Sequence, residues 1–416
     1  MDKRENNDLN KSGKYLVWIG FILYVFITGG KNVYTAELVT LMDVFNATKA
    51  QITLATTYYF VTYAVAQVIL LFIMSKLNLR TFITISAMLT GVAIVVIGTS
   101  TSLTAIYVIQ ALNGFLSAGI YIGIMAALSK SLPAELLPYS NKIMSLGGAI
   151  YNVLSYGLSA LFVGFGMWRT PFIITGIGSV IFGILFFLAL GKMKKFNIEK
   201  VEREDKKDEP IFTLKGKKDL LLYYVIFIVI ALFSNVPYYC IFVYVPNLMK
   251  EVFAMPDSYS ILITLIVPLG SSLFAVLSVS MCARRRNIFK VGVLFSFLCV
   301  IAIAMLMLLY SKNIILSLVL VIAVIGLRAA SSTVVSSVLA FNMRKQVNTG
   351  SYLAAVNSVA SLCAGIVPPI IGNLIDLKGY SASYLVALVA MALMFISLIF
   401  LSVNFNKKEK NLGNNL

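Results

Sequence analysis

The sequence predicts an all-α membrane protein of twelve transmembrane helices, arranged as two pseudo-symmetric bundles of six. Three observations predict this fold class: the composition, the spacing of the apolar runs and the distribution of basic residues. Of the 416 residues, 59% are hydrophobic and 12% are charged, against roughly 45–50% and about 25% in soluble domains. A soluble protein of this length could not cover so much apolar surface, so a membrane location is expected.

The apolar runs have the length of membrane-spanning helices, each of which needs about 20 residues. The first six runs cover Tyr15–Leu38, Ile52–Met74, Thr81–Ile97, Thr104–Leu128, Ile143–Phe165 and Phe172–Leu190. After a polar stretch, six more cover Leu220–Val245, Ile261–Met281, Phe289–Leu309, Ile314–Phe341, Tyr352–Leu374 and Ser383–Val403.

The basic residues alternate between the connections and thereby predict the orientation. Of the 34 lysines and arginines, 27 lie in the tails and in the connections after even-numbered spans, and five lie in the connections after odd-numbered spans. Cytoplasmic loops carry the excess of basic residues. We therefore expect both termini to be cytoplasmic in a plasma (inner) membrane. The net charge of +17 then reflects topology rather than nucleic-acid binding.

Residues 191–219 form the only long hydrophilic connection, and their mixed charges predict a flexible cytoplasmic linker. It separates a six-helix bundle at 15–190 from another at 220–403, with tails at 1–14 and 404–416. The halves resemble each other: LMDVFNATKAQITL after the first span parallels LMKEVFAMPDSYSILI after the seventh, about 207–208 residues later. Such repeats predict a rocking transporter whose site lies between the halves.

Several kinds of chemistry lack the residues that they need. The four cysteines have neither metal-site nor disulfide-framework spacing, and the chain has no histidine. Paired carboxylates or a nucleophile with a base are also missing at membrane depth. We therefore expect no cofactor, no metal and no enzymatic activity.

The eleventh span and its exit, GIVPPIIGNLIDLKGY, resemble the helix-11 pattern of the major facilitator superfamily. In that pattern glycines and a proline come before an acidic residue, a glycine and an aromatic residue. The chain is similar to this superfamily over its whole length. The resemblance implies the major facilitator fold, with spans 1, 4, 7 and 10 lining a central cavity.

The first span, GGKNVYTAEL, resembles the organophosphate:phosphate antiporter branch of that superfamily. The branch carries Arg-Lys-Asn where this chain has GKN at 30–32, and a second arginine that falls near Tyr238. Its helix-2 lysine falls on Gln67 and its helix-5 histidine on Tyr151. Because both arginines are absent, a phosphate-ester substrate does not follow from the resemblance. The superfamily motif between spans 2 and 3 is reduced to MSKLNLR without its acid, so gating salt bridges built on it should be missing or remade.

Two cations lie well inside the predicted spans, Lys31 in the first and Arg328 in the tenth. Each should cost about 2.5–3.5 kcal/mol at a helix centre, and such residues usually face a cavity or a partner. One cation on a cavity-lining helix of each half would hold an anion. Two alternatives remain open. In the first, Lys31 would neutralise Glu37, although a spacing of six residues puts the two side chains on different faces of the helix. In the second, Arg328 would bond backbone carbonyls of a neighbouring helix.

Tyrosine and amide side chains near these cations are orienting partners for a small polar ligand. Packing or a place at the membrane interface is the alternative role for the tyrosines. We expect substrate contacts from Lys31, Arg328, Tyr34, Thr28, Tyr63, Gln67, Asn113, Tyr151, Tyr238 and Tyr239.

These observations predict a secondary transporter of a small organic anion, a carboxylate or a phosphorylated metabolite, working by rocker-switch exchange or uptake. Glu37, the only carboxylate inside a predicted span, is the candidate for proton coupling. Two alternatives stay open: a proton-coupled carrier of a neutral or drug-like solute, and a transporter-like sensor of an external ligand. We expect a monomer in the lipid bilayer, with a small-molecule substrate as its partner and no nucleic acid.

Overall fold

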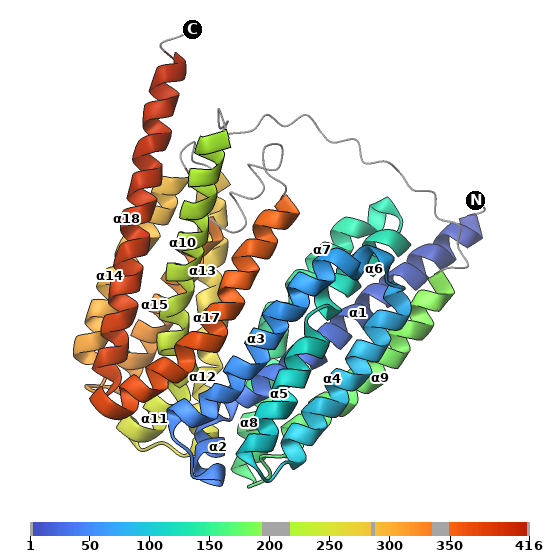
Figure 1. Ribbon diagram of the computed structural model, residues 1–416, viewed down its shortest axis with the longest axis horizontal. Helices are drawn as coiled ribbons and strands as arrows, with labels where there is room; N and C mark the ends of the chain where they lie inside the picture. The colour runs from blue at the N-terminus through green and yellow to red at the C-terminus, as the bar shows by residue number, and fades with distance from the viewer. Residues whose placement is uncertain (1–2, 194–216, 284–287, 335–348, 414–416) are drawn as a thin grey trace. The chain divides into compact units, whose positions relative to one another are not determined.

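The computed structural model describes residues 3–193, 217–283, 288–334 and 349–413, and within them the regular structure is helical, with no strand (Figure 1). The first half contains α1 (Lys3–Ala36), α2 (Leu38–Phe45), α3 (Lys49–Ile73), α4 (Leu79–Thr99), α5 (Leu103–Ser117), α6 (Ile120–Ser131), α7 (Leu137–Ser145), α8 (Gly147–Gly164) and α9 (Thr170–Met193). The second half contains α10 (Lys217–Ile241), α11 (Val245–Phe253), α12 (Asp257–Thr264), α13 (Ile266–Ala283), α14 (Phe289–Leu309), α15 (Ile314–Thr333), α17 (Thr349–Lys378) and α18 (Tyr380–Gly413).

Twelve helical segments within the described residues are long and apolar enough to cross a membrane, as the sequence predicts. Some ends coincide with the predicted ones, as in α14, whereas α1 begins at Lys3 because the polar tail continues the helix. Most of the predicted linker and the end of the predicted tenth span lie outside the described residues.

Several spans are interrupted helices. The fourth consists of α5 and α6, and the fifth of α7 and α8, which meet at Leu146 just before two glycines. Glycine lowers helix propensity by about 1 kcal/mol relative to alanine, so the two glycines after Leu146 favour an interruption there. In the seventh span, α10 contains Pro237 and gives way at Phe242–Tyr244 to a 3-10 turn that leads into α11.

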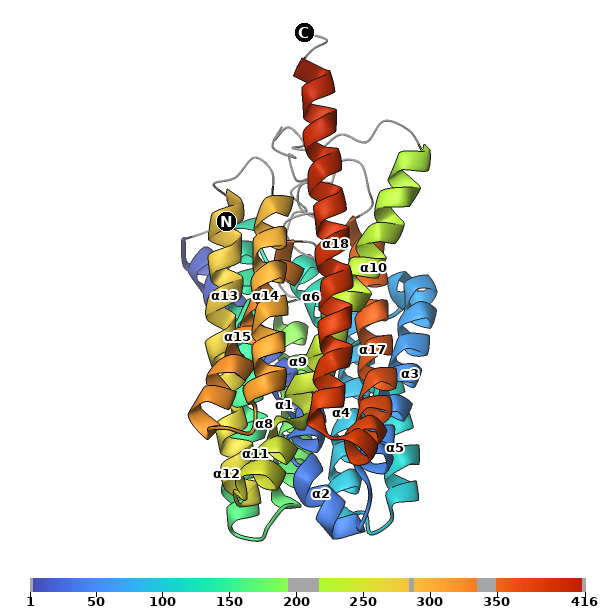
Figure 2. The same ribbon diagram turned by 90° about the vertical axis from the view of Figure 1, so that its left-hand side faces the viewer.

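The chain forms two compact units. Unit 1 consists of Met1–Ala47, Leu54–Lys206 and Asp257–Leu262, and unit 2 of Thr48–Thr53, Lys207–Pro256 and Ile263–Leu416. Within unit 1, α9 packs on α1 and α4, and α1 also packs on α8. Within unit 2, α18 packs on α10 and α14 (Figure 2), and α10 also packs on α17. The seventh, ninth, eleventh and twelfth spans thus repeat the packing of the first, third, fifth and sixth.

Each unit includes one short segment from the other half of the chain. The first turn of α3 belongs to unit 2 and the start of α12 belongs to unit 1. The turn before each segment has the same backbone. Asn46 and Ala254, which end α2 and α11, adopt φ of 46° and 52° and are the non-glycine residues with positive φ in the described chain. The sequence repeat therefore extends to the backbone of this turn.

Candidate functional site

Lys31 lies on α1 in unit 1, and its ammonium group faces two aromatic rings of α3. Its Nζ lies 5.1 Å from the ring centroid of Phe60 and 5.9 Å from that of Tyr59, within the range of cation–π attraction. Among the described residues, both ion pairs involve Lys49 and none involves Lys31. The charge of Lys31 is therefore held by rings alone and has no carboxylate to compensate it there.

Gly30, the residue before Lys31, lets α1 approach its neighbours closely. A Cβ at this position would lie 2.6 Å from Ile94 Cδ1 of α4 and 3.2 Å from Thr175 Oγ1 of α9. A side chain at residue 30, such as the arginine of the antiporter branch, would require the Ile94 side chain to shift. The neighbouring helices thus pack closely around α1 next to Lys31.

Tyr63 and Gln67 lie close to the rings that face Lys31. The Tyr63 ring stacks on Tyr59 with centroids 5.8 Å apart, and Gln67 follows Tyr63 by four residues, one turn further along α3. We call Lys31, Tyr59, Phe60, Tyr63 and Gln67 the α1–α3 cluster. It brings together three of the predicted substrate contacts, and it combines a cation with hydroxyl and amide groups.

The other predicted contacts of unit 1 lie outside this cluster. Tyr34 and Asn113 are each 1% exposed, so they belong to the interior of the bundle. The Tyr151 ring meets the edge of the Tyr24 ring at 6.1 Å, and Thr28 follows Tyr24 by four residues, one turn further along α1. Tyr151 therefore contacts α1 at Tyr24.

Arg328 lies on α15 in unit 2 and contacts α10. Its Nη1 donates a hydrogen bond to the carbonyl oxygen of Ser234 at 3.1 Å, and its guanidinium carbon lies 5.0 Å from the Tyr238 ring centroid. Arg328 thus makes the contact that the sequence analysis gave as the alternative, a hydrogen bond to a backbone carbonyl of a neighbouring helix. The Nε has no hydrogen-bond partner within the described residues, so the side chain keeps a donor for a further acceptor.

The two predicted tyrosines of α10 differ in their contacts. Tyr238 lies against Arg328 and stacks on Phe242 with centroids 4.9 Å apart. Tyr239 meets Tyr238 edge on at 5.1 Å. Of these two, the ring of Tyr238 is the one against the guanidinium.

The comparison with known proteins decides the family. A family model described as Major Facilitator Superfamily matches residues 20–346. The chain belongs to the major facilitator superfamily. It is accordingly a multi-pass membrane transporter of a small molecule and not an enzyme. No curated protein matches the sequence.

Solved structures of major facilitator transporters share this fold. A D-xylose-proton symporter is 14% identical with a TM-score of 0.70, and the match covers 93% of this chain and 97% of that one. A bacterial homolog of the human lysosomal transporter Spinster, inward-facing and occupied, is 13% identical with a TM-score of 0.68, over 95% and 97%. The nucleoside transporter NupG is 13% identical with a TM-score of 0.67, over 95% and 99%. At such identities the likeness concerns the fold.

Glu37 follows α1 directly in this major facilitator transporter and is fully buried. Ser159 of α8 lies beside it. Neither of its carboxylate oxygens has a clear hydrogen-bond partner within the described chain, and no ion pair there joins it to Lys31. The described residues therefore do not show an ion pair between Lys31 and Glu37.

Phe60 and Ser234 contact the two cations but were not predicted from the sequence. Phe60 is one of 27 phenylalanines, and nothing in its spacing separates it from packing residues. Ser234 contributes a backbone carbonyl, which every residue carries. A phenylalanine that faces a cation and a backbone carbonyl that binds one therefore cannot be recognised from the sequence.

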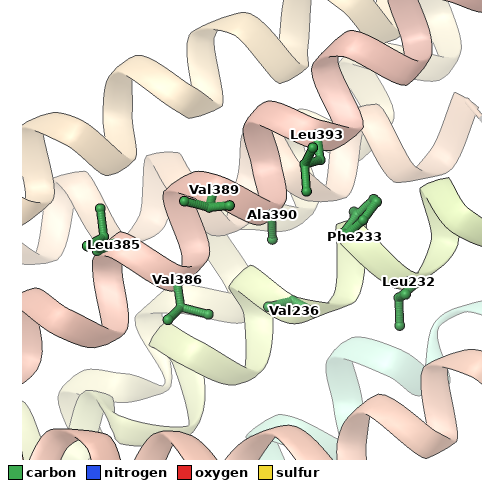
Figure 3. Close-up of a pocket in the computed structure, with 8 residues that line it drawn as sticks. All are labelled: Leu232, Phe233, Val236, Leu385, Val386, Val389, Ala390 and Leu393. Carbon is green, nitrogen blue, oxygen red and sulfur yellow. The ribbon is translucent and has the colours of Figure 1, made fainter.

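An apolar groove of about 450 Å³ lies between α10 and α18 in unit 2 (Figure 3). Its lining consists of Leu232, Phe233, Val236, Leu385, Val386, Val389, Ala390 and Leu393. Because this lining offers no charged or hydrogen-bonding side chain, the groove suits hydrocarbon and not a polar solute.

Proposed function

We propose that this transporter carries a small organic anion, a carboxylate or a phosphorylated metabolite, by rocker-switch alternating access. The observation that supports this proposal is Lys31, a cation at membrane depth without an acidic partner in the described chain. Such residues mark substrate or ion pathways. The distribution of basic residues supports an orientation with both termini cytoplasmic. We also propose that the protein lies in the plasma (inner) membrane and acts as a monomer.

The α1–α3 cluster gives each group a role in this proposal. Lys31 supplies the charge that binds the anion, and the rings of Tyr59 and Phe60 stabilise the ammonium while no anion is bound. Tyr63 and Gln67 offer a hydroxyl and an amide that orient the ligand. Arg328 is the corresponding cation of unit 2, and its Nε is the donor left for a ligand.

We further propose that the transporter exchanges one anion for another. Neither intramembrane cation has a carboxylate partner among the described residues. A carrier with two such charges would change conformation reluctantly while empty, because the charges stay uncompensated. Bound anion removes this cost in either direction. Exchange is therefore faster than net uptake of the anion.

The experiment begins with a thermal-shift screen of the purified protein against carboxylates and phosphate esters, since binding to the folded state raises the unfolding temperature. A labelled hit is then measured by counterflow in proteoliposomes. Lys31→Gln should abolish counterflow, and Lys31→Arg, which keeps the charge, should retain part of it. Counterflow that Lys31→Gln leaves unchanged contradicts the proposal.

A second candidate is a proton-coupled carrier of a neutral solute, with Glu37 as the proton carrier. Its support is the burial of Glu37 without a cation among the described residues, and the names of two solved relatives, which refer to nucleosides and to D-xylose with protons. An imposed pH gradient separates the candidates. Accumulation of a neutral solute that needs the gradient and is lost in Glu37→Gln favours the second, and anion counterflow retained in Glu37→Gln favours the first.

A further inference from the structure

Three tyrosines from three different spans meet within unit 1. The Tyr24 ring of α1 lies 4.8 Å from the Tyr121 ring of α6, at an interplanar angle of 44°, and 6.1 Å from the Tyr151 ring of α8, edge on. Both separations lie in the range of roughly 4.5–7 Å in which aromatic rings attract one another. We call Tyr24, Tyr121 and Tyr151 the tyrosine cluster. It joins the first, fourth and fifth spans around one central ring.

Gly147 makes room for this central ring. A Cβ at residue 147 would lie 2.5 Å from Cε1 and 2.8 Å from Cδ1 of Tyr24. This glycine is the first residue of α8, directly after the break in the fifth span. A Cβ at the next residue, Gly148, would meet no atom of the described chain within 4 Å. The backbone of Gly147 therefore holds the Tyr24 ring in place, and Gly148 does not touch it.

The tyrosine cluster keeps aromatic surface uncovered. Tyr121 is 41% exposed, and Tyr24 and Tyr151 are half-buried. By contrast, Tyr34 of the same unit is 1% exposed, as expected of a ring that only fills the interior. Tyrosine also brings a hydroxyl into the membrane, where a polar group needs a partner. Uncovered rings with hydroxyl groups suit a planar ligand that has polar substituents.

The central ring shares a helix face with Lys31. Tyr24 precedes Lys31 by seven residues, which places the two on the same side of α1, roughly 10 Å apart along the axis. Thr28 lies between them on that side. These three residues are half-buried, whereas Leu23 and Ile27 are buried. A face that carries a cation and two hydroxyl groups is not one that lipid hydrocarbon covers.

Helix α3 supplies polar groups along the same stretch. The Lys31 ammonium faces rings of α3, and Tyr63 and Gln67 come later on that helix. Because consecutive spans cross the membrane in opposite directions, these two residues lie level with the part of α1 that precedes Lys31. The hydroxyl of Tyr63 and the amide of Gln67 are therefore at the membrane depth between the cation and the tyrosine cluster.

We propose that the anion carried by this transporter bears an aromatic ring, which stacks in the tyrosine cluster while its carboxylate or phosphate binds Lys31. The inference rests on the proposed function, because it names the substrate class of the same site. Aryl carboxylates with a short spacer and nucleoside monophosphates both combine a ring with an anionic group. An aliphatic dicarboxylate fits less well, because its second charge would meet the negative faces of the tyrosine rings.

The test compares ligands that differ only in the ring. Phenylacetate, phenylpropanoate and phenylbutanoate are each paired with the cyclohexyl acid of the same chain length, which has the same charge and nearly the same size. Dissociation constants are measured by calorimetry on the full-length protein in lipid nanodiscs. The aromatic member of at least one pair should bind about tenfold more tightly, because stacking adds to the burial of apolar area. Adenosine monophosphate paired with ribose phosphate tests the nucleotide in the same way.

Matched variants assign this preference to the tyrosine cluster. Gly147→Ala displaces the Tyr24 ring and should abolish the preference for the aromatic member, whereas Gly148→Ala, the same change one residue later, should leave it unchanged. Tyr24→Phe keeps the ring and should keep the preference. If Gly147→Ala fails to fold, Tyr121→Leu removes the most exposed ring of the cluster instead and should abolish the preference.

Equal affinity within every pair overturns the inference, as does a preference that both Gly147→Ala and Tyr121→Leu leave unchanged. The preference is a ratio between ligands of the same charge, so its failure differs from a failure of the proposed function. Acids that bind without a ring preference and depend on Lys31 contradict the aromatic substrate and leave the anion site standing. Affinities that Lys31→Gln does not change contradict the anion site, and absence of binding by every pair overturns both.

Discussion

Replacement of Lys31 by methionine should make the transporter more stable and inactive at the same time. A lysine at a helix centre in the membrane costs about 2.5–3.5 kcal/mol, and its attraction to the rings of Phe60 and Tyr59 offsets about 0.5–2 kcal/mol of this. Methionine is similar in length, and its sulfur contributes about 0.3–1.5 kcal/mol against the same rings. The net gain in free energy of unfolding is about 2 kcal/mol.

Thermal unfolding in a mild detergent without ligand measures this gain. A stability change of 1 kcal/mol moves the unfolding midpoint by roughly 2–4 °C in a unit of about 200 residues, so Lys31→Met should raise it by roughly 4–8 °C. Lys31→Arg, which keeps the charge, should show no such rise. The same preparations are tested for counterflow, which Lys31→Met should lack. A midpoint that falls in Lys31→Met refutes the reasoning, because the ammonium would then be a stabilising structural group.

Three further predictions concern stability. Gly114→Ala places a Cβ against the backbone of α3 and should lower the free energy of unfolding by about 1–3 kcal/mol. Gly157→Ala, with open space around it, should raise the free energy of unfolding by up to about 1 kcal/mol. The two unfolding midpoints should therefore shift in opposite directions. Ala254→Gly relieves a backbone at φ 52° and should raise the midpoint, with a gain of about 1 kcal/mol. Asn32→Ala removes a hydrogen bond from α1 to α8 and should lower it, by about 0.6 kcal/mol.

The spans could be predicted because a membrane helix is a local property of about 20 apolar residues. The ends of α14 at Phe289 and Leu309 agree in the sequence and in the structure. The break at Leu146 was not predicted. It lies inside a polar-to-apolar transition, and glycines alone do not fix where a helix is interrupted.

The candidate site could be predicted in part. A charged residue inside an apolar run can be recognised in the sequence, so Lys31 and Arg328 could be identified as intramembrane cations without coordinates. Their surroundings were not: Phe60 faces one cation and the carbonyl of Ser234 binds the other. Lys49 was predicted only as a basic residue in a connection, and Tyr34 only as a substrate contact, although it is nearly fully buried.

The sequence by itself determined the number of spans, the repeat and the family, because composition and order along the chain carry them. Only the tertiary structure decided which groups contact each charged side chain. Lys49 and Asp376 lie 327 residues apart, and they meet because Gly372 lets two backbones approach. Such a contact depends on the rotation of each helix about its axis, which is set by packing against neighbours and cannot be derived from spacing within one helix.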